Sequence, residues 1–443
     1  MKNIIITLLG ILFGTISSLS AQEQHLLLKV DSLLSLAAQN SKQLEITRHK
    51  INISANATTI EKQRAYLPEL GASFSYGYIS NAQVWDNHFN YETTIMMPHT
   101  SLDLSLSAGY VVFNGNAAKN KIARAKLEEQ ISLLDYQKDK EDIQFLLLAK
   151  YLDLFASRNQ EHVYLQNIAL ADKRLANIKK LIEQGMLTHN DLVRSQLQLT
   201  DIKQQLNEVR NNITIINHDL KTVLALPENI AIDVDTLLYN KAIAPGPLNQ
   251  YTMRLRDKIP ELKIANVQNQ LAVNQVDITK ADRLPSISLF AGDALSRPFL
   301  YSIPPQDIYL HHLQVGFRIR YDISSLYKSK NLIQQARMNA VLSQKSEEWA
   351  NQQVEMAIHA AYVKLQNAWE QYASKKESFQ LAQDNYRVVE QKYLNKFATI
   401  TDMLDASTAL LTAQINMNNA RIGIVYQHYN LLKTSGLWEE VRN

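Results

Sequence analysis

The sequence predicts a mainly helical protein with a small β part, built as two copies of one plan. Glycine and proline are scarce, 12 and 10 in 443 residues, which is too few for an all-β protein and suits long uninterrupted helices. A turn followed by a helix start occurs twice, as THNDLVRSQLQL at 188–199 and as TITDMLDASTALL at 399–411. Four short stretches alternate apolar and polar residues, as strands do.

Residues 1–21 predict a secretory signal peptide. Lys2 precedes an apolar run from Ile4 to Phe13, and small residues follow from Ser18 to Ala21, which is the order of regions in such a signal. The run is too short to span a membrane as a helix. A buried N-terminal helix is the alternative, disfavoured because nothing charged or amphipathic interrupts the run.

Composition narrows the class of protein. The chain has no cysteine and a formal net charge of +3, so we expect no disulfide, thiol chemistry or cysteine-linked lipid anchor. It has no dense Lys/Arg block, and we expect no nucleic-acid partner. After the signal, no window approaches the roughly 20 apolar residues of a transmembrane helix. If the chain enters a membrane, it does so as strands.

The repeat extends beyond the turn. Placing Asp191 on Asp402, an offset of 211 residues, keeps the two following helices in register without a gap. Similar offsets pair AYLPELGASFSY with DRLPSISLFAGD, and NKIARAK with NLIQQAR. A unit of roughly 200 residues is far longer than a solenoid repeat. We therefore expect a signal at 1–21, a first repeat at 22–227, a linker at 228–248 and a second repeat at 249–443.

Each repeat is expected to hold a short helix, one very long helix and a third helix. The predicted ranges are 41–66, 117–184 and 188–227 in the first repeat, and 261–283, 326–397 and 400–437 in the second. A helix of about 68 residues spans about 100 Å and needs a lateral partner to bury its apolar stripe. Between Val354 and Tyr393 apolar residues recur with a period near 3.5, which predicts coiled-coil packing. An ordinary globular bundle is the alternative, and it would show wider stripes and shorter helices.

Strands are expected at about 70–80, 101–113, 285–293 and 312–322. Their alternation places apolar residues on one face and polar ones on the other, so Asp103, Arg318 and Arg320 are expected to face a lumen. This pattern is typical of a transmembrane β-barrel, although a half-buried sheet in a soluble domain gives the same alternation. The signal peptide, the missing disulfides and the long helices favour the barrel.

Four strands cannot close a barrel in lipid, because an open edge leaves backbone groups unpaired. Two copies would supply eight strands with a filled interior, whereas three supply twelve and leave a lumen. We therefore expect a homotrimer in contact with membrane lipid.

The repeated turn carries the candidate site. Thr188 and Thr399 each stand three residues before Asp191 and Asp402, the spacing of a capping box. Asp405 is different, because its repeat counterpart is an arginine and capping does not require an acid there. In a trimer such acids would form rings that hold cations; a solvated surface acid is the alternative reading.

The signal peptide, the duplicated plan and the stretch KYLNKFATITDMLDASTALLTAQ at 392–414 resemble the TolC family of bacterial outer-membrane efflux proteins. The resemblance implies a homotrimer with a 12-stranded β-barrel in the outer membrane and a coiled-coil helical barrel extending into the periplasm. It implies an exit duct of a tripartite efflux pump or type I secretion system, which meets a periplasmic adaptor (membrane fusion) protein and an inner-membrane pump. A soluble periplasmic coiled-coil scaffold or adaptor is the alternative.

The resemblance also implies roles for residues at the turns. Asp402 and Asp405 match the family's aperture acids, Tyr393 matches its aperture tyrosine, and Asp191 matches the acid with which a tip arginine pairs. Lys396 stands where a glycine is usual.

The tip arginine of the family is replaced by Ala398, so the closed-state pairing is expected to differ, with Lys396 as the candidate partner of Asp191. No metal spacing, phosphate-binding glycine loop or nucleophile motif occurs in the sequence. We therefore expect neither a cofactor nor an enzymatic activity. The polar segments 79–100 and 294–310 are expected to be loops outside the cell.

Overall fold

The computed structural model describes residues 24–235, 245–252 and 258–439. The expected signal peptide lies outside the described residues, as does part of the segment between the repeats. The chain forms two compact units. The hairpin unit comprises Met1–Glu45, Asp139–Lys258 and Glu355–Asn443, and the sheet unit comprises Ile46–Lys138 and Ile259–Val354.

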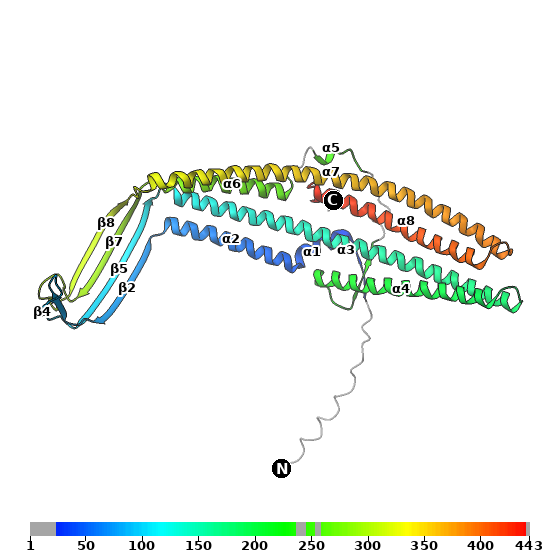
Figure 1. The fold of residues 1–443 in the computed structure, drawn as a ribbon, viewed down its shortest axis with the longest axis horizontal. Helices are drawn as coiled ribbons and strands as arrows, with labels where there is room; N and C mark the ends of the chain where they lie inside the picture. Colours follow the sequence, from blue (N-terminus) through cyan, green and yellow to red (C-terminus); the bar gives the residue numbers. More distant parts are fainter. Residues whose placement is uncertain (1–23, 236–244, 253–257, 440–443) are drawn as a thin grey trace, which may run out of the picture. The chain divides into compact units, whose positions relative to one another are not determined.

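The sheet unit contains an antiparallel four-stranded sheet (Figure 1). Its order is β2 (Glu69–Tyr78), β5 (Thr100–Phe113), β7 (Ser286–Arg297) and β8 (Leu310–Arg320). Each repeat thus contributes two neighbouring strands, and β5 joins β7 across the repeats. The sheet does not close on itself, because β2 and β8 each pair on one side only. A mainly helical fold with a small β part is confirmed.

Strand register separates the sheet into an apolar and a polar face. Phe74 lies opposite Leu104, and Ser75 lies opposite Asp103. Because directly paired residues share a face, the same alternation passes from strand to strand. The polar face carries all three residues that the sequence assigns to a lumen, Asp103, Arg318 and Arg320.

Strand β7 is longer than the alternation predicts. The expected strand ends at 293 and a loop was expected from 294, but β7 continues to Arg297 because residues 294–297 pair with β5. Phe290 is an aromatic residue on the polar face, and the Arg318 guanidinium lies 5.1 Å from its ring centroid. A Cβ at Gly316 would lie 2.9 Å from the Phe290 ring, so the glycine makes room for it.

The expected loop at 79–100 is partly wrong as well. It contains a β-hairpin, β3 (Ala82–Trp85) paired with β4 (Tyr91–Ile95). At the turn of this hairpin the Asp86 carboxylate accepts hydrogen bonds from the backbone N–H groups of His88 and Asn90 at 2.8 and 2.7 Å. This short-range pairing organises a segment whose composition indicated only a polar loop.

Each of the four strands of the sheet is connected to a helix at one of its ends. These helices are α2 (Lys42–Tyr66), α3 (Ala117–Glu183), α6 (Pro260–Ala281) and α7 (Ser325–Leu394). Thr58 of α2 donates to Glu129 of α3 at 2.8 Å. Two asparagines of α6, Asn266 and Asn269, donate to Glu347 of α7 at 3.0 and 2.8 Å. Polar contacts therefore fix the register of each short helix on its long neighbour. None of the helices in the described ranges is long and apolar enough to cross a membrane.

The hairpin unit is built from two helical hairpins. The long helix α3 turns into α4 (His189–Leu224), and α7 turns into α8 (Ile400–Thr434). The predicted seam of α7 is buried at Ile358, Ala361 and Leu365. Farther along, Tyr386 and Val389 remain half-buried in the single chain. The seam therefore packs most tightly in its first part.

The same unit holds a small module that the sequence did not reveal. Strand β1 (Gln24–Leu28) pairs in parallel with β6 (Ile230–Val234), within the segment expected to be a linker. The buried Tyr151 hydroxyl donates to the Leu28 carbonyl and accepts from the Asp235 N–H, both at 2.6 Å. This hydroxyl therefore links α3 to the module.

Helix α1 (Val30–Asn40) completes the module. The short α5 (Asn249–Thr252) instead contacts α7, with the Tyr251 ring centroid 6.1 Å from the Tyr362 ring centroid. The buried Gln144 side chain donates to the Leu34 carbonyl at 2.8 Å and accepts from the Trp438 indole N–H at 2.9 Å. Segments near both ends of the described chain are thereby joined to α3.

Candidate functional site

The turns at the hairpin ends have the same backbone conformation in both repeats. Gly185 and Lys396 both adopt φ = 68°. At Gly185, the N–H groups of Gly185 and Met186 donate to the Ile182 and Leu181 carbonyls at 2.8 Å. Lys396 and Phe397 repeat this bonding to Tyr393 and Lys392 at 3.0 and 2.7 Å. These are Schellman endings, in which glycine is the preferred left-handed residue, so Lys396 holds its turn against a steric penalty.

The C-terminal ends of α4 and α8 have the same type of ending, but here the glycine is in the second repeat and the other residue is in the first. Ala225 after α4 has φ = 53°, and Gly436 after α8 has φ = 74°. At its two hairpin-helix endings, each repeat therefore has one glycine and one other residue in the left-handed conformation.

The expected capping boxes are present in both repeats. The Asp191 N–H donates to the Thr188 hydroxyl at 3.3 Å, and the Asp191 carboxylate accepts from the Thr188 N–H at 2.8 Å. The corresponding distances between Asp402 and Thr399 are 3.2 and 2.9 Å. The Thr399 hydroxyl and then its N–H lower the pKa of the Asp402 carboxyl below its usual value, because both bonds favour the charged form.

Tyr393 and Asp191 lie near one another without a hydrogen bond. The Tyr393 hydroxyl is buried and has no hydrogen-bond partner among the described residues. Burial, and secondarily the negative charge of Asp191, raise the pKa of Tyr393. A buried hydroxyl without a partner is costly in free energy, so this donor is available to another group at the hairpins.

Asp405 and Lys396 point to solvent in the single chain. Both side chains are exposed, and neither forms an ion pair or side-chain hydrogen bond with another described residue. Asp191 uses its carboxylate to cap its own helix. The expected Lys396 to Asp191 pairing is therefore not formed within the chain and remains a prediction for contacts between copies.

Arg174 joins the two hairpins through several hydrogen bonds. From α3 it donates to Gln198 of α4 at 3.1 Å, to Ser407 of α8 at 3.0 Å and to Tyr386 of α7 at 3.4 Å. The Tyr386 hydroxyl in turn donates to Glu390 at 3.1 Å. One guanidinium thus contacts all three other helices, a use to which its five donors are suited.

Three more hydrogen bonds join the two repeats. Arg194 of α4 donates to the Thr401 hydroxyl at 2.8 Å. Gln198 donates to the Leu404 carbonyl at 3.1 Å and to the Thr408 hydroxyl at 2.9 Å. Arg194 is the repeat counterpart of Asp405, so the two hairpins present opposite charges at matching positions.

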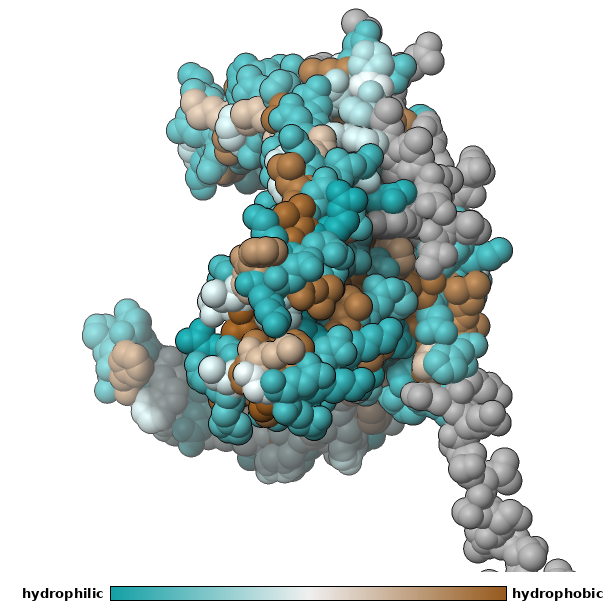
Figure 2. Space-filling view, turned by 90° about the vertical axis from the view of Figure 1, so that its right-hand side faces the viewer, coloured by the Kyte–Doolittle hydropathy of each residue, from teal (hydrophilic) through white to brown (hydrophobic). Residues whose placement is uncertain are grey.

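The sequence pointed to the acids at the turns but missed Arg174, Gln198 and Tyr386. A weak signal was available, since the α7 seam carries a hydroxyl group at Tyr386 where the matching position of α3 is the apolar Leu175. Figure 2 faces the hairpin end, where hydrophobic patches lie among hydrophilic side chains. Exposed apolar residues at the turns include Met186, Leu394 and Phe397. Within the described ranges, no cluster of three or more His, Cys, Asp or Glu could hold a metal.

Comparison with known proteins places this geometry in a family. A family model described as outer membrane efflux protein matches residues 33–226 and 254–436. The chain is 22% identical to the outer membrane protein TolC of Escherichia coli K12, over 99% of this chain and 87% of that protein. It is 20% identical to the outer membrane efflux protein BepC of Brucella suis, over 90% of this chain and 83% of that protein.

Solved structures share the fold at lower identity. The outer membrane protein VceC of Vibrio cholerae has a TM-score of 0.74 and 14% identity, over 92% of this chain and 96% of that one. The outer-membrane channel OprN has a TM-score of 0.73 and 13% identity, over 92% and 89%. The family model matches more than half of the chain. The chain therefore belongs to the outer membrane efflux protein family, and it is an outer-membrane exit duct of Gram-negative efflux.

Proposed function

We propose that three copies of this chain form a passive export duct, in which a shared 12-stranded barrel opens to the exterior and the helical hairpins form a gated periplasmic end. The observation that carries the proposal is the open four-stranded sheet, with one unpaired edge on β2 and another on β8. In hydrocarbon both edges must be paired. Pairing the β8 edge of one copy with the β2 edge of the next satisfies both.

The apolar face of the sheet supports this assembly. In the single chain Phe74, Val315 and Phe317 are 65%, 73% and 68% exposed. An apolar face of this kind is expected to contact lipid rather than water. The alternative, a soluble periplasmic scaffold, would leave these side chains in water, and for that reason we do not favour it.

The duct itself carries out no chemistry in this proposal. A periplasmic adaptor would meet the hairpin turns, and an inner-membrane pump would supply the energy and select the substrate. The exposed apolar side chains at the turns, together with the unsatisfied Tyr393 hydroxyl, offer groups for contacts with the adaptor or between copies.

The assembly is tested by separating inner and outer membranes and measuring the mass of the detergent-extracted protein by light scattering. The expected result is a trimer in the outer-membrane fraction. A monomer that is released without detergent would exclude the shared barrel and require a soluble role for the sheet.

At the gate we propose that Asp402 and Asp405 form acidic rings around the axis of the trimer. Asp405→Ala should then weaken block by a multivalent cation added at the periplasmic side in single-channel recordings. Asp201→Ala provides the control, because Asp201 is an exposed acid farther along α4. If Asp405→Ala and Asp201→Ala were blocked equally, Asp405 would be only a surface acid.

A further inference from the structure

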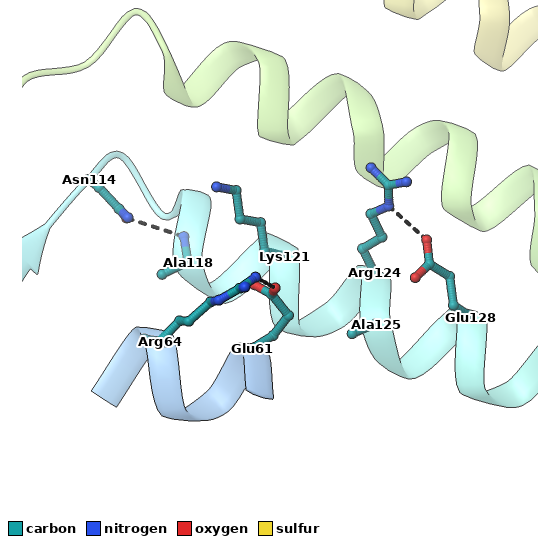
Figure 3. Close-up of a pocket in the computed structure, with 9 residues that line it drawn as sticks. Glu61, Arg64, Asn114, Ala118, Lys121, Arg124, Ala125 and Glu128 are labelled. Atoms are coloured by element: carbon teal, nitrogen blue, oxygen red, sulfur yellow. Dashed lines mark hydrogen bonds and ion pairs between the residues drawn. The ribbon is translucent and has the colours of Figure 1, made fainter. Parts of the chain in front are cut away.

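The junction between the helices and the sheet contains a pocket that the duct function does not use. This junction pocket, of about 430 Å3, lies between the end of α2 and the start of α3. Figure 3 shows its charged residues, Glu61 and Arg64 from α2 and Lys121, Arg124 and Glu128 from α3. Ala65, Ala118 and Ala125 also line it, so small side chains leave the space open.

The charges in the junction pocket are not balanced. Arg64 pairs with Glu61 at 2.7 Å, and Arg124 pairs with Glu128 at 2.9 Å. Lys121 forms no ion pair or side-chain hydrogen bond with any described residue. Three cations therefore lie beside two carboxylates. Arg124 also donates to Gln275 of α6 at 3.1 Å, and each arginine retains N–H donors beyond these bonds.

The second repeat shows that the fold does not require these charges. With the offset of 211, Lys121, Arg124 and Glu128 correspond to Leu332, Gln335 and Asn339. Aligning Pro68 with Pro285 places Glu61 and Arg64 on two uncharged residues, Ile278 and Ala281. The same helix–strand junction is thus built twice, and only one copy has the charged cluster.

We propose that the junction pocket binds the phosphate group of a glycerophospholipid from the periplasmic leaflet. Guanidinium and ammonium groups together favour phosphate oxygens. The pocket is large enough for more than a bare ion, since a water molecule has a share of roughly 30 Å3 in the liquid. The organic part of the headgroup would occupy the remaining volume.

The position of the junction pocket selects a lipid over a solute, and this step rests on the proposed orientation of the duct. Asn114, which lines the pocket, directly follows the last residue of β5. Leu67 in the link from α2 to β2 and Leu70 near the start of β2 both have exposed apolar side chains. If the strands span the membrane and the helices extend into the periplasm, the pocket lies at the level of the periplasmic headgroups, with apolar surface beside it for acyl chains.

The test uses the full-length protein in dodecylmaltoside and measures binding by native mass spectrometry. The probes are dioctanoylphosphatidylglycerol, dioctanoylglycerol without phosphate, and inorganic phosphate. The variant is Lys121→Leu combined with Arg124→Gln, because the second repeat has these residues at the same helical positions. Lys126→Leu is the control, since Lys126 is exposed on the same helix outside the pocket lining.

Wild type and the control should bind the phospholipid at least tenfold more tightly than the double variant, because the double variant has lost hydrogen bonds to a charged ligand. Equal binding by the double variant, or equal binding of dioctanoylglycerol, would overturn the proposal. If inorganic phosphate binds as tightly as the phospholipid, the pocket is a phosphate site, but its ligand is a free phosphate ion and not a lipid headgroup.

Single-channel conductance separates this proposal from the duct function. The double variant should conduct like wild type, because the pocket is not part of the gate. Loss of lipid binding with normal conductance supports the pocket. Retained lipid binding by a protein that forms no channels would instead contradict the duct.

Discussion

Replacing Arg174 should loosen the contact between the two hairpins and favour the open state of the proposed gate. Arg174→Met keeps an apolar stem of similar length and removes three hydrogen bonds, at 3.0, 3.1 and 3.4 Å. A bond of this kind contributes on the order of 1 kcal/mol net, and the longest contributes least. The expected loss is about 2 kcal/mol, because Ser407 is also left buried without this donor.

If these bonds break when the hairpins separate, a loss of about 2 kcal/mol raises the open-to-closed ratio about 30-fold. The assay is single-channel recording of the purified protein in planar bilayers. Arg387→Met is the matched control, since Arg387 of α7 forms only an exposed bond to Asp384 at 3.2 Å. An open probability unchanged by Arg174→Met, or raised equally by Arg387→Met, would refute the reasoning.

Three further changes test other parts of the structure. Trp438→Phe should lower the free energy of unfolding by about 1 kcal/mol, because it removes the indole donor to Gln144; chemical denaturation would show no such loss for Trp349→Phe, whose side chain is exposed. Burial raises the pKa of Tyr151 to about 12 from 10.0. The contribution of Tyr151 to the free energy of unfolding is therefore intact below pH 10 and is lost between pH 10 and 12, by about 1.4 kcal/mol per pH unit. Tyr151→Phe should make this alkaline loss shallower, and the exposed Tyr301→Phe should not; identical slopes would contradict the assignment. Gly185→Ala should destabilise its turn by about 1 kcal/mol and speed local hydrogen exchange, whereas Lys396→Gly should not. Equal exchange rates at the two turns in these variants would contradict a steric penalty at the left-handed position.

Features that depend on neighbours in sequence were predictable. Thr188 and Asp191 stand three residues apart, so the capping box could be inferred from four letters of sequence, and both repeats form it. The alternation of β5 and β8 likewise fixes which residues share a face once the strands pair. The same local logic located the long helices, whose interiors lack glycine and proline.

Features that depend on distant partners were not predictable. The strands β1 and β6 are five residues each and pair across roughly 200 residues of chain, so neither forms a pattern strong enough to detect. Arg174 was not identified from the sequence, because its acceptors come from three other helices. Asp293 lies on the apolar face of the sheet, with its carboxylate 2.6 Å from the His311 ring nitrogen. Alternation within one strand does not reveal this pair, because the two polar residues lie on different strands.

The left-handed endings of the four hairpin helices have a consequence for how the hairpins can bend. Glycine reaches many backbone conformations, whereas lysine and alanine reach few, so we expect the α3–α4 turn at Gly185 to act as a soft hinge and the α7–α8 turn at Lys396 as a stiff one. In the proposed ring of three chains, soft and stiff hinges would alternate around the axis. We therefore expect any widening of that ring to bend at every second hairpin rather than evenly at all of them.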